Sequence, residues 1–288
     1  MLGTIIGDIA GSIYEYKELQ DTRKGKINLE RRLEILNKKD LFTDTSFISD
    51  DTILTVATLD CILNKKDYEK TYREYALSHD ELNEAKDHFK YAFSKDFMNW
   101  SNKNFVNEWI GKSHGNGAAM RVSPIGMIYS PIEKVEEEAK KSAMTSHNSE
   151  EGIKGAQAIA SCVYMARMKF PKEEMKSYIT SKYAYDLDMN LEELQQTNKF
   201  DSTCQITVPQ AIYLFLESNG FEDSIRKAIS IGGDTDTIAA MVGGISEAYY
   251  TIPKELQEKA LTYIKEDNMK NILEEHYKFS EIEKSKII

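Results

Sequence analysis

Apolar residues recur at intervals of three and four along most of the chain, which places them on one face of an α-helix. The same spacing within residues 67–109 predicts core-facing helices, with Trp100 and Trp109 as packing residues. No segment shows the sustained alternation of a strand, so the sequence predicts an all-α fold. Helices are expected over residues 2–16, 29–36, 53–63, 131–144, 152–168, 172–183, 191–196, 208–218, 221–231, 238–250 and 253–264.

We expect these helices to form one compact domain of residues 1–288, because no stretch rich in Pro, Gly or Ser divides the chain. Hydrophobic residues make up 41% of the sequence, which is enough for a sizeable core. Cys61, Cys162 and Cys204 are far apart, odd in number and set in apolar helical patterns. They are therefore expected to be reduced core residues, not a disulfide or zinc framework.

Charge and hydropathy limit what the protein can bind. The formal net charge of −10 argues against broad nucleic-acid binding, which needs a basic face to neutralise phosphates. The sequence lacks a run of about 18 apolar residues that would span a membrane, and its N-terminus lacks the charged start of a signal peptide. We expect a soluble cytoplasmic monomer, in which any phosphorylated ligand must find its positive charge locally.

Two short stretches concentrate acidic side chains at predicted helix starts. One Asp or Thr already satisfies the free backbone amides of a helix start, so each stretch carries more acid than capping needs. Adjacent like charges repel without a counter-ion, and carboxylate and hydroxyl oxygens are the ligands of hard divalent cations. The stretches are Ser49-Asp50-Asp51-Thr52, before the apolar run 53–63, and Gly232-Gly233-Asp234-Thr235-Asp236-Thr237, before the run 238–250.

Two interpretations of these stretches are open. Either both are over-acidic helix caps, or they are two halves of one divalent-cation site. A single stretch favours the cap, whereas finding the same construction twice favours the metal site.

The first predicted helix carries Gly3, Gly7 and Gly11 at intervals of four, which aligns them in one stripe. Glu15 is the next position on that stripe. Each glycine costs about 1 kcal/mol in helix propensity, so the stripe needs a reason. Close packing against another helix is one explanation. The other is that the stripe floors a pocket into which Glu15 points.

Residues 113–124 interrupt the helical spacing with small side chains. Gly115 and Gly117 flank Asn116, which predicts backbone amides that are free to face an anion. The alternative is an ordinary glycine turn before a buried helix. His147 lies in a predicted loop beside a helix start, and it is either a structural residue or a ligand contact.

Together these motifs resemble those of the ADP-ribosylglycohydrolase family, which includes dinitrogenase-reductase-activating glycohydrolase and the human ADP-ribosylhydrolases. The resemblance covers nearly the whole chain and implies a compact all-helical domain that carries two Mg2+ or Mn2+ ions. Five ordered motifs carry it: Gly7-Asp8-Ile9-Ala10-Gly11-Ser12-Ile13-Tyr14-Glu15, Ser49-Asp50-Asp51-Thr52, Gly115-Asn116-Gly117 with Met120-Arg121, Ser146-His147, and Gly232-Gly233-Asp234-Thr235-Asp236-Thr237.

The resemblance also implies roles for single residues. Glu15 matches the glutamate of the serine-ADP-ribosylhydrolase branch, where it gates the site and helps to activate water. Two features depart from that branch, because His114 replaces a frequent aromatic residue and residues 17–47 cannot be aligned. The implied metal ligands are Ser49, Asp50, Asp51, Asp234, Asp236 and Thr237. The implied ADP-ribose contacts are Ser113, His114, Gly115, Asn116, Gly117 and His147.

The implied activity is hydrolysis of the glycosidic bond between ADP-ribose and an acceptor, which is a protein side chain or a small conjugate. Two cations about 3.5–4 Å apart can hold the ribose diol, polarise the bond at the anomeric carbon and lower the pKa of a bridging water. The rival hypotheses are a two-metal phosphohydrolase and a catalytically silent ADP-ribose-binding or structural protein. Mutually repelling carboxylates argue against the silent protein, and the acceptor linkage stays open.

Overall fold

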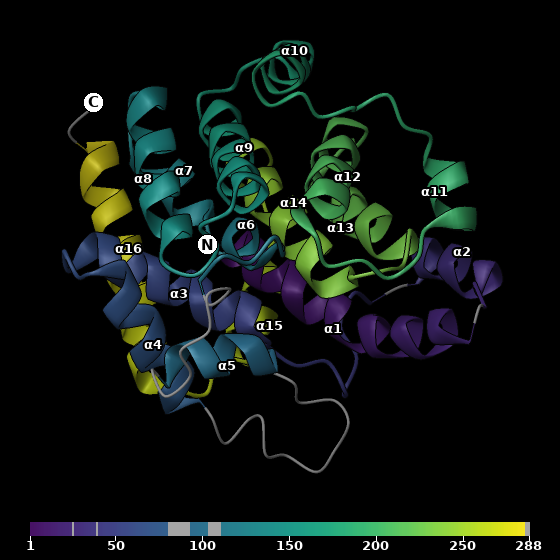
Figure 1. Ribbon diagram of the computed structural model, residues 1–288, viewed down its shortest axis with the longest axis horizontal. Coiled ribbons are helices and arrows are strands. Elements are labelled where there is room, and N and C mark those ends of the chain that lie inside the picture. Colours follow the sequence, from purple (N-terminus) through teal and green to yellow (C-terminus); the bar gives the residue numbers. More distant parts are fainter. Residues whose placement is uncertain (25, 39, 80–92, 103–110, 286–288) are drawn as a thin grey trace.

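The computed structural model of the protein describes residues 1–24, 26–38, 40–79, 93–102 and 111–285. This part of the chain is helical and contains no strand, only the isolated bridges Lys112–His147 and Gly115–Thr203 (Figure 1). The all-α prediction is therefore confirmed. The helices are α1 (Leu2–Arg23), α2 (Leu29–Asn37), α3 (Asp50–Leu63), α4 (Tyr68–Ser78), α5 (Lys95–Ser101), α6 (Gly117–Met120), α7 (Ser123–Ile128), α8 (Ile132–Met144), α9 (Glu150–Arg167), α10 (Lys172–Tyr183), α11 (Leu191–Thr197), α12 (Cys204–Leu216), α13 (Phe221–Ser230), α14 (Thr235–Tyr249), α15 (Lys254–Leu261) and α16 (Asp267–Ser285).

The largest differences from the predicted helices are found at α1, α12 and α16. α1 is predicted to end at residue 16 but continues to Arg23. The residues that follow position 16 include good helix formers, namely Lys, Glu, Leu and Gln. α12 begins at Cys204, before the predicted start at residue 208, and contains Pro209. α16 lies beyond the last predicted helix. Apolar spacing thus locates most helices but not their polar ends.

The stretch 67–109 is only partly described. There α4 and α5 confirm the predicted helices, and Trp100 is buried as expected, with the Arg73 guanidinium carbon 4.1 Å from its ring centroid. Residues 80–92 and 103–110, which contain the remaining predicted helical positions and Trp109, lie outside the described residues. The three cysteines are buried and free, as predicted.

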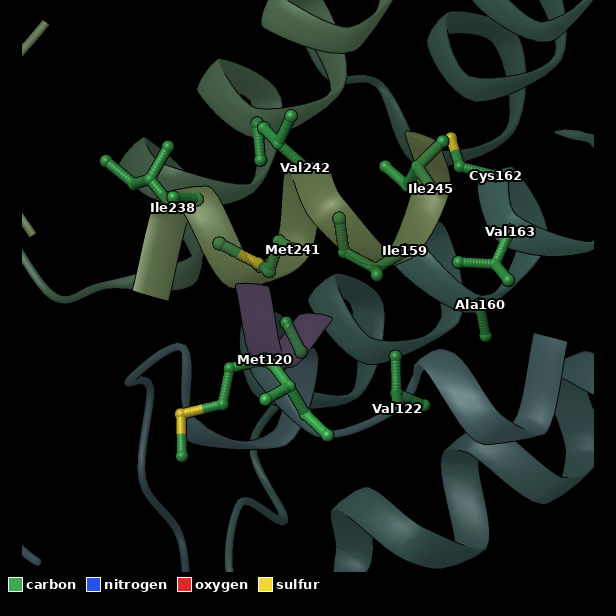
Figure 2. Packing of buried hydrophobic residues seen from close by; sticks show 14 of the residues in the cluster. Met120, Val122, Ile159, Ala160, Cys162, Val163, Ile238, Met241, Val242 and Ile245 are labelled. Atoms are coloured by element: carbon green, nitrogen blue, oxygen red, sulfur yellow. The ribbon is translucent and has the colours of Figure 1, made fainter. Parts of the chain in front are cut away.

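α14 runs through the middle of the molecule and contacts α1, α3, α6, α7, α9, α12 and α13 (Figure 1). Its side chains are buried on all sides from Thr235 to Ser246. Figure 2 shows Met241 and Ile245 of this helix among buried residues of α9, such as Ile159, and near Met120 of α6. Despite such burial, no helix among the described residues is long and apolar enough to cross a membrane. The single domain of residues 1–288 stays a prediction.

α1 and α14 are antiparallel along a seam of glycines, in which Gly3 lies opposite Gly243 and Gly7 opposite Ala239. Gly11 lies against the backbone of Asp236 in the first turn of α14. A Cβ atom at any of the three α1 glycines would overlap backbone atoms of α14, so only glycine permits this approach. The packing explanation of the stripe is therefore confirmed for the glycines. The seam also directs the next position, Glu15, toward the start of α14.

Candidate functional site

The two acidic stretches meet at the end of the glycine seam, where the first turns of α3 and α14 approach α1. Thr237 Oγ1 donates a hydrogen bond to Asp51 Oδ2 at 3.2 Å, which joins the two stretches directly. The predicted juxtaposition of the two helix starts is therefore observed. We call the acidic side chains gathered here the carboxylate cluster: Asp8, Glu15, Asp50, Asp51, Asp234 and Asp236.

Asp8 is the member of the cluster to which the sequence reasoning gave no role. It is fully buried on α1, and its oxygens accept hydrogen bonds from the backbone amides and hydroxyls of Ser49 and Thr52. These bonds fix the start of α3 against α1. A signal was present in the sequence, because Asp8 precedes Glu15 by two helical turns and so lies on the same face of the helix.

The cluster contains two overlapping groups of three carboxylates. One group is Asp8, Asp51 and Asp236, and the other is Glu15, Asp234 and Asp236. Within each group, one oxygen from each residue lies within 4.8 Å of the others. Because Asp236 belongs to both groups, the arrangement offers oxygen ligands for two neighbouring cations that share one carboxylate.

The hydrogen bonding of Asp51 fits a bound cation. This side chain is buried, and its Oδ2 accepts from Ser49 Oγ at 3.1 Å as well as from Thr237. Its Oδ1 is buried without a hydrogen-bond partner among the described residues. Such an oxygen costs free energy unless a donor or cation satisfies it. The cluster therefore fits a hard divalent ion, and its oxygen-only ligands are those of Mg2+ or Mn2+.

Burial and mutual repulsion shift the pKa values of the cluster. Burial raises the pKa of Asp50, Asp51 and Asp236 well above the usual range of an aspartate, and neighbouring carboxylates raise it further. Burial, followed by the charge of Asp234, raises the pKa of Glu15 to about 8. Without cations the cluster therefore retains protons at neutral pH, and cation binding would displace them.

Asp234 joins the cluster to the predicted substrate residues through Asn116. Asn116 Nδ2 donates to Asp234 Oδ2 at 2.7 Å and to Thr207 Oγ1 at 3.2 Å. The Asp234 side chain makes no capping hydrogen bond to α14, so this carboxylate does not serve as a helix cap. Gly232 and Gly233 set its position with positive φ angles of 68° and 84°, which favour glycine.

Residues 113–117, Ser146 and His147 form a second group, which we call the histidine turn. The Gly115 amide donates to Ser113 Oγ at 3.0 Å, and the Asn116 amide donates to a backbone carbonyl of the segment before α12 at 2.9 Å. The prediction of free amides is therefore wrong for these two residues, because the turn pairs with that segment. In the described part of the chain, the Gly117 amide has no such partner.

His147 is buried, and its ring lies against Gly117. A Cβ atom on Gly117 would lie only 2.8 Å from His147 Nε2, so glycine gives the ring its place. Burial, followed by the positive charge of Arg121, lowers the pKa of His147 well below its usual range. The imidazole is therefore neutral at physiological pH.

The remaining predicted site residues occupy the edges of these two groups. Asp50 is half-buried and belongs to neither group of three carboxylates. Burial, followed by the nearby charges of Asp8 and Glu15, raises its pKa. Ser113 and His114 are exposed at the rim of the histidine turn. The structure thus brings the predicted residues to one place, and their roles as ligands stay predictions.

Comparison with known proteins places the chain among ADP-ribosylhydrolases. Residues 1–279 match the ADP-ribosylglycohydrolase family. ADP-ribosylhydrolase ARH3 of Homo sapiens is 24% identical over 93% of this chain and 89% of that protein. An uncharacterized protein of Archaeoglobus fulgidus is 33% identical over 49% of this chain and 52% of the relative, so the match spans about half of that protein.

Two further similarities concern a more distant enzyme and the fold. ADP-ribosylarginine hydrolase Tri1 of Pseudomonas putida is 27% identical over 50% of this chain and 42% of Tri1. A chain of a solved ADP-ribosylglycohydrolase-related protein complex superposes with a TM-score of 0.63 and 21% identity, over 91% of this chain and 93% of its own length. At this identity the solved structure supports the fold alone.

Proposed function

Because the chain belongs to the ADP-ribosylglycohydrolase family, we propose that it hydrolyses the glycosidic bond between ADP-ribose and a modified acceptor, with release of ADP-ribose. The family resemblance and the enzyme class expected from the sequence are confirmed by the comparisons. One observation carries the proposal for this chain: two groups of three carboxylates share Asp236, and Glu15 belongs to one of them.

Two divalent cations, Mg2+ or Mn2+, are proposed as the cofactors. When bound, they would hold the ribose hydroxyls and polarise the bond at the anomeric carbon. The buried Asp51 oxygen without a donor supports this proposal, and Asp8 positions the start of α3 for it. The proposed ligands are Ser49, Asp50, Asp51, Asp234, Asp236 and Thr237.

Glu15 is proposed as the general acid–base residue. It lies at the end of the glycine seam, where it is less buried than the aspartates of the first carboxylate group. A pKa of about 8 lets its carboxyl exchange a proton near neutral pH, which is the range that a general acid or base needs.

The histidine turn is proposed to hold ADP-ribose. His147 Nε2 lies against Gly117, and among the described residues neither Nε2 nor the Gly117 amide has a hydrogen-bond partner. Both can therefore donate hydrogen bonds to phosphate or ribose oxygens. Asn116 keeps this turn at a fixed position relative to Asp234. Exposed Ser113 and His114 would contact the ligand at the rim.

Assay of a panel of ADP-ribosylated substrates tests the proposed function. Peptides linked through arginine or serine, and small ADP-ribose esters, are incubated with Mg2+, Mn2+ or a chelator, and the products are identified by mass spectrometry. Free ADP-ribose is expected only with cation. AMP or inorganic phosphate would indicate the two-metal phosphohydrolase instead. ADP-ribose binding without turnover of any substrate would indicate the silent binding protein.

The name of Tri1 makes the arginine-linked peptide the first substrate in this panel, whereas the glutamate motif resembles the serine branch. Asp236→Asn serves as the inactive control, because it removes the carboxylate that both groups share. Exposed Asp188→Asn is the matched control for loss of an acidic side chain elsewhere. Equal activity of Asp236→Asn and Asp188→Asn would refute the proposed site.

A further inference from the structure

A buried chain of hydrogen bonds leads from Arg121 to His147. Arg121 is fully buried, and its Nη2 donates to Ser146 Oγ at 2.9 Å and to the Ser142 carbonyl at 3.2 Å. Ser146 Oγ lies 2.8 Å from His147 Nδ1. The side chains of Arg121, Ser146 and His147 are nearly inaccessible to solvent, so water does not easily replace a missing hydrogen-bond partner.

The direction of each bond follows from the chemistry of its donors. A guanidinium carries only donors, so Ser146 Oγ must accept from Arg121. Ser146 then has one proton, and His147 Nδ1 is the one remaining partner of its oxygen among the described residues. If Nδ1 carried a proton as well, Ser146 Oγ would accept from both Arg121 and His147, and the buried Ser146 proton would have no acceptor among the described residues. Nδ1 is therefore the acceptor.

The position of Arg121 enforces this direction. No carboxylate forms a salt bridge with it in the described part of the chain. Its guanidinium carbon lies 4.0 Å from the ring centroid of Tyr72, so the aromatic face and the carbonyl near the C-terminus of α8 stabilise the charge. A buried cation beside His147 also disfavours a second positive charge on the imidazole.

We infer that Arg121 and Ser146 are positioning residues that hold His147 as the neutral tautomer with its proton on Nε2, directed at Gly117. The Nε2 atom has no protein hydrogen-bond partner within the described residues. It is therefore a fixed donor that remains available to a ligand of the turn. The aligned donor needs an acceptor such as a phosphate or hydroxyl oxygen.

The assignment of that acceptor to ADP-ribose rests on the proposed function. A histidine with the opposite tautomer would present a lone pair to the ligand and would repel a phosphate oxygen. The tautomer itself is a property of the protein without ligand. It can therefore be tested separately from the activity.

The test is the nitrogen NMR spectrum of the imidazole rings in ligand-free protein labelled with 15N-histidine. The sequence contains five histidines, so the His147 signals are assigned by their loss in His147→Gln. Wild type is expected to show an unprotonated Nδ1 and a protonated Nε2 at neutral pH. In Ser146→Ala, both nitrogen shifts are expected to move toward the average of the two tautomers, because no group then selects between them.

Ser142→Ala is the matched control. It also removes a buried serine hydroxyl close to Arg121, but that hydroxyl bonds to Tyr72 at 2.7 Å and does not contact the His147 ring. The His147 signals of Ser142→Ala should equal those of wild type. A wild-type Nδ1 that carries a proton, or a Ser146→Ala spectrum identical to wild type, would overturn the inference.

A binding measurement separates this inference from the proposed function. Calorimetric titration with ADP-ribose is expected to show roughly tenfold weaker binding to Ser146→Ala, the loss typical of one hydrogen bond. Rescue by Ser146→Thr, which keeps the hydroxyl, would exclude a general packing effect. If wild type does not bind ADP-ribose, the proposed function fails, while the spectrum still decides the tautomer. Unchanged affinity in Ser146→Ala would overturn the role assigned to the tautomer in binding.

Discussion

Asn116 of the histidine turn donates a hydrogen bond to Asp234 of the carboxylate cluster, but the polar groups of the two regions are arranged differently. In the cluster, acceptors outnumber donors, an oxygen of Asp51 has no hydrogen-bond partner among the described residues, and burial raises the pKa values. In the histidine turn, the Ser113 hydroxyl and the Ser146 hydroxyl are both engaged, and His147 is neutral.

This difference indicates which of the two regions would bind the proposed cations. A set of buried carboxylates is electrostatically incomplete until cations or protons neutralise it. The histidine turn needs neither, because it contains no carboxylate and His147 is neutral. Its Gly117 amide and His147 Nε2 are donors left for a ligand, not charges that a cation must neutralise. We therefore expect cation removal and mutation to affect the two halves separately, and each of the following predictions tests that separation.

The largest effect is expected for Asp236→Asn, which alters both groups of three carboxylates. Loss of the shared ligand should reduce turnover by about 10³-fold or more, since metal catalysis supplies several kcal/mol. Steady-state assays in Mg2+ and Mn2+ measure this loss. ADP-ribose binding to the histidine turn should persist in part. Turnover within tenfold of wild type would mean that the cluster is not the reaction centre.

Glu15→Gln should reduce turnover by about 10²–10⁴-fold, which is the usual contribution of general acid–base catalysis. The amide has nearly the same shape but cannot exchange a proton, so ADP-ribose affinity should change little. Turnover and binding are measured in the same cation buffer. Unchanged turnover would reduce Glu15 to the last position of the packing seam.

Cation binding should stabilise wild type more than Asp236→Asn. A hundredfold excess of cation over its Kd adds about 2.7 kcal/mol to the free energy of unfolding, which corresponds to roughly 5–10 °C in Tm. In chelator the order should reverse, because folding of wild type places the Asp236 carboxyl among other buried carboxylates, which costs either repulsion or uptake of a proton, and the variant avoids that cost. Thermal melts of both proteins in both buffers decide this. If the Tm of wild type does not change on addition of Mg2+ or Mn2+, the acidic stretches are only helix caps.

Gly117→Ala should weaken ADP-ribose binding by about tenfold, because the added Cβ would lie 2.8 Å from His147 Nε2 and displace the ring. The cation-induced rise in Tm should remain, since Gly117 does not contact the cluster carboxylates that are proposed to bind cation. Titration calorimetry and melts measure the two quantities. A loss of the Tm rise together with the affinity would show that the two halves are not separate.

The smallest expected effect is a pH dependence of stability in chelator. The pKa of Glu15 is raised in the folded protein from 4.5 to about 8, so the folded state retains a proton that the unfolded state has lost. Stability is therefore full below pH 4.5 and falls as the pH rises through about 8. Saturating cation should flatten this slope. Chemical unfolding at several pH values measures it, and a slope of opposite sign would contradict the assigned pKa.

The sequence was informative where a feature depends on residues that lie close together along the chain. Hydrophobic spacing locates the helices, and two acidic helix starts are unusual enough to predict that Asp51 and Asp236 come together. Glycines at intervals of four similarly predict a close helix contact. The position of α1 relative to α14 follows from Gly7 and Gly11, although the sequence alone does not name the partner helix.

The parts that sequence reasoning missed depend on partners remote in the chain. In the sequence, Asp8 is a single acidic residue in an apolar helix. Its role becomes visible only in the folded protein, where Ser49 and Thr52 donate hydrogen bonds to it. The Asn116 amide is predicted to be free, whereas the remote Ser202 carbonyl accepts its hydrogen bond. The tautomer of His147 depends on the buried Arg121, which contacts Ser146 only in the folded protein. No local sequence pattern indicates that Arg121 and Ser146 lie within hydrogen-bond distance.

The glycine seam has a consequence for synthesis in the cell. Gly11 contacts the backbone around Asp236, so the carboxylate cluster cannot assemble until the start of α14 has left the ribosome. Until then, the first turns of α1 present apolar side chains such as Ile5, Ile6 and Ile9 without their partner helix. Contacts of such long sequence separation also slow folding. The apolar face of α1 therefore lacks the backbone against which its glycines pack until α14 has been synthesised.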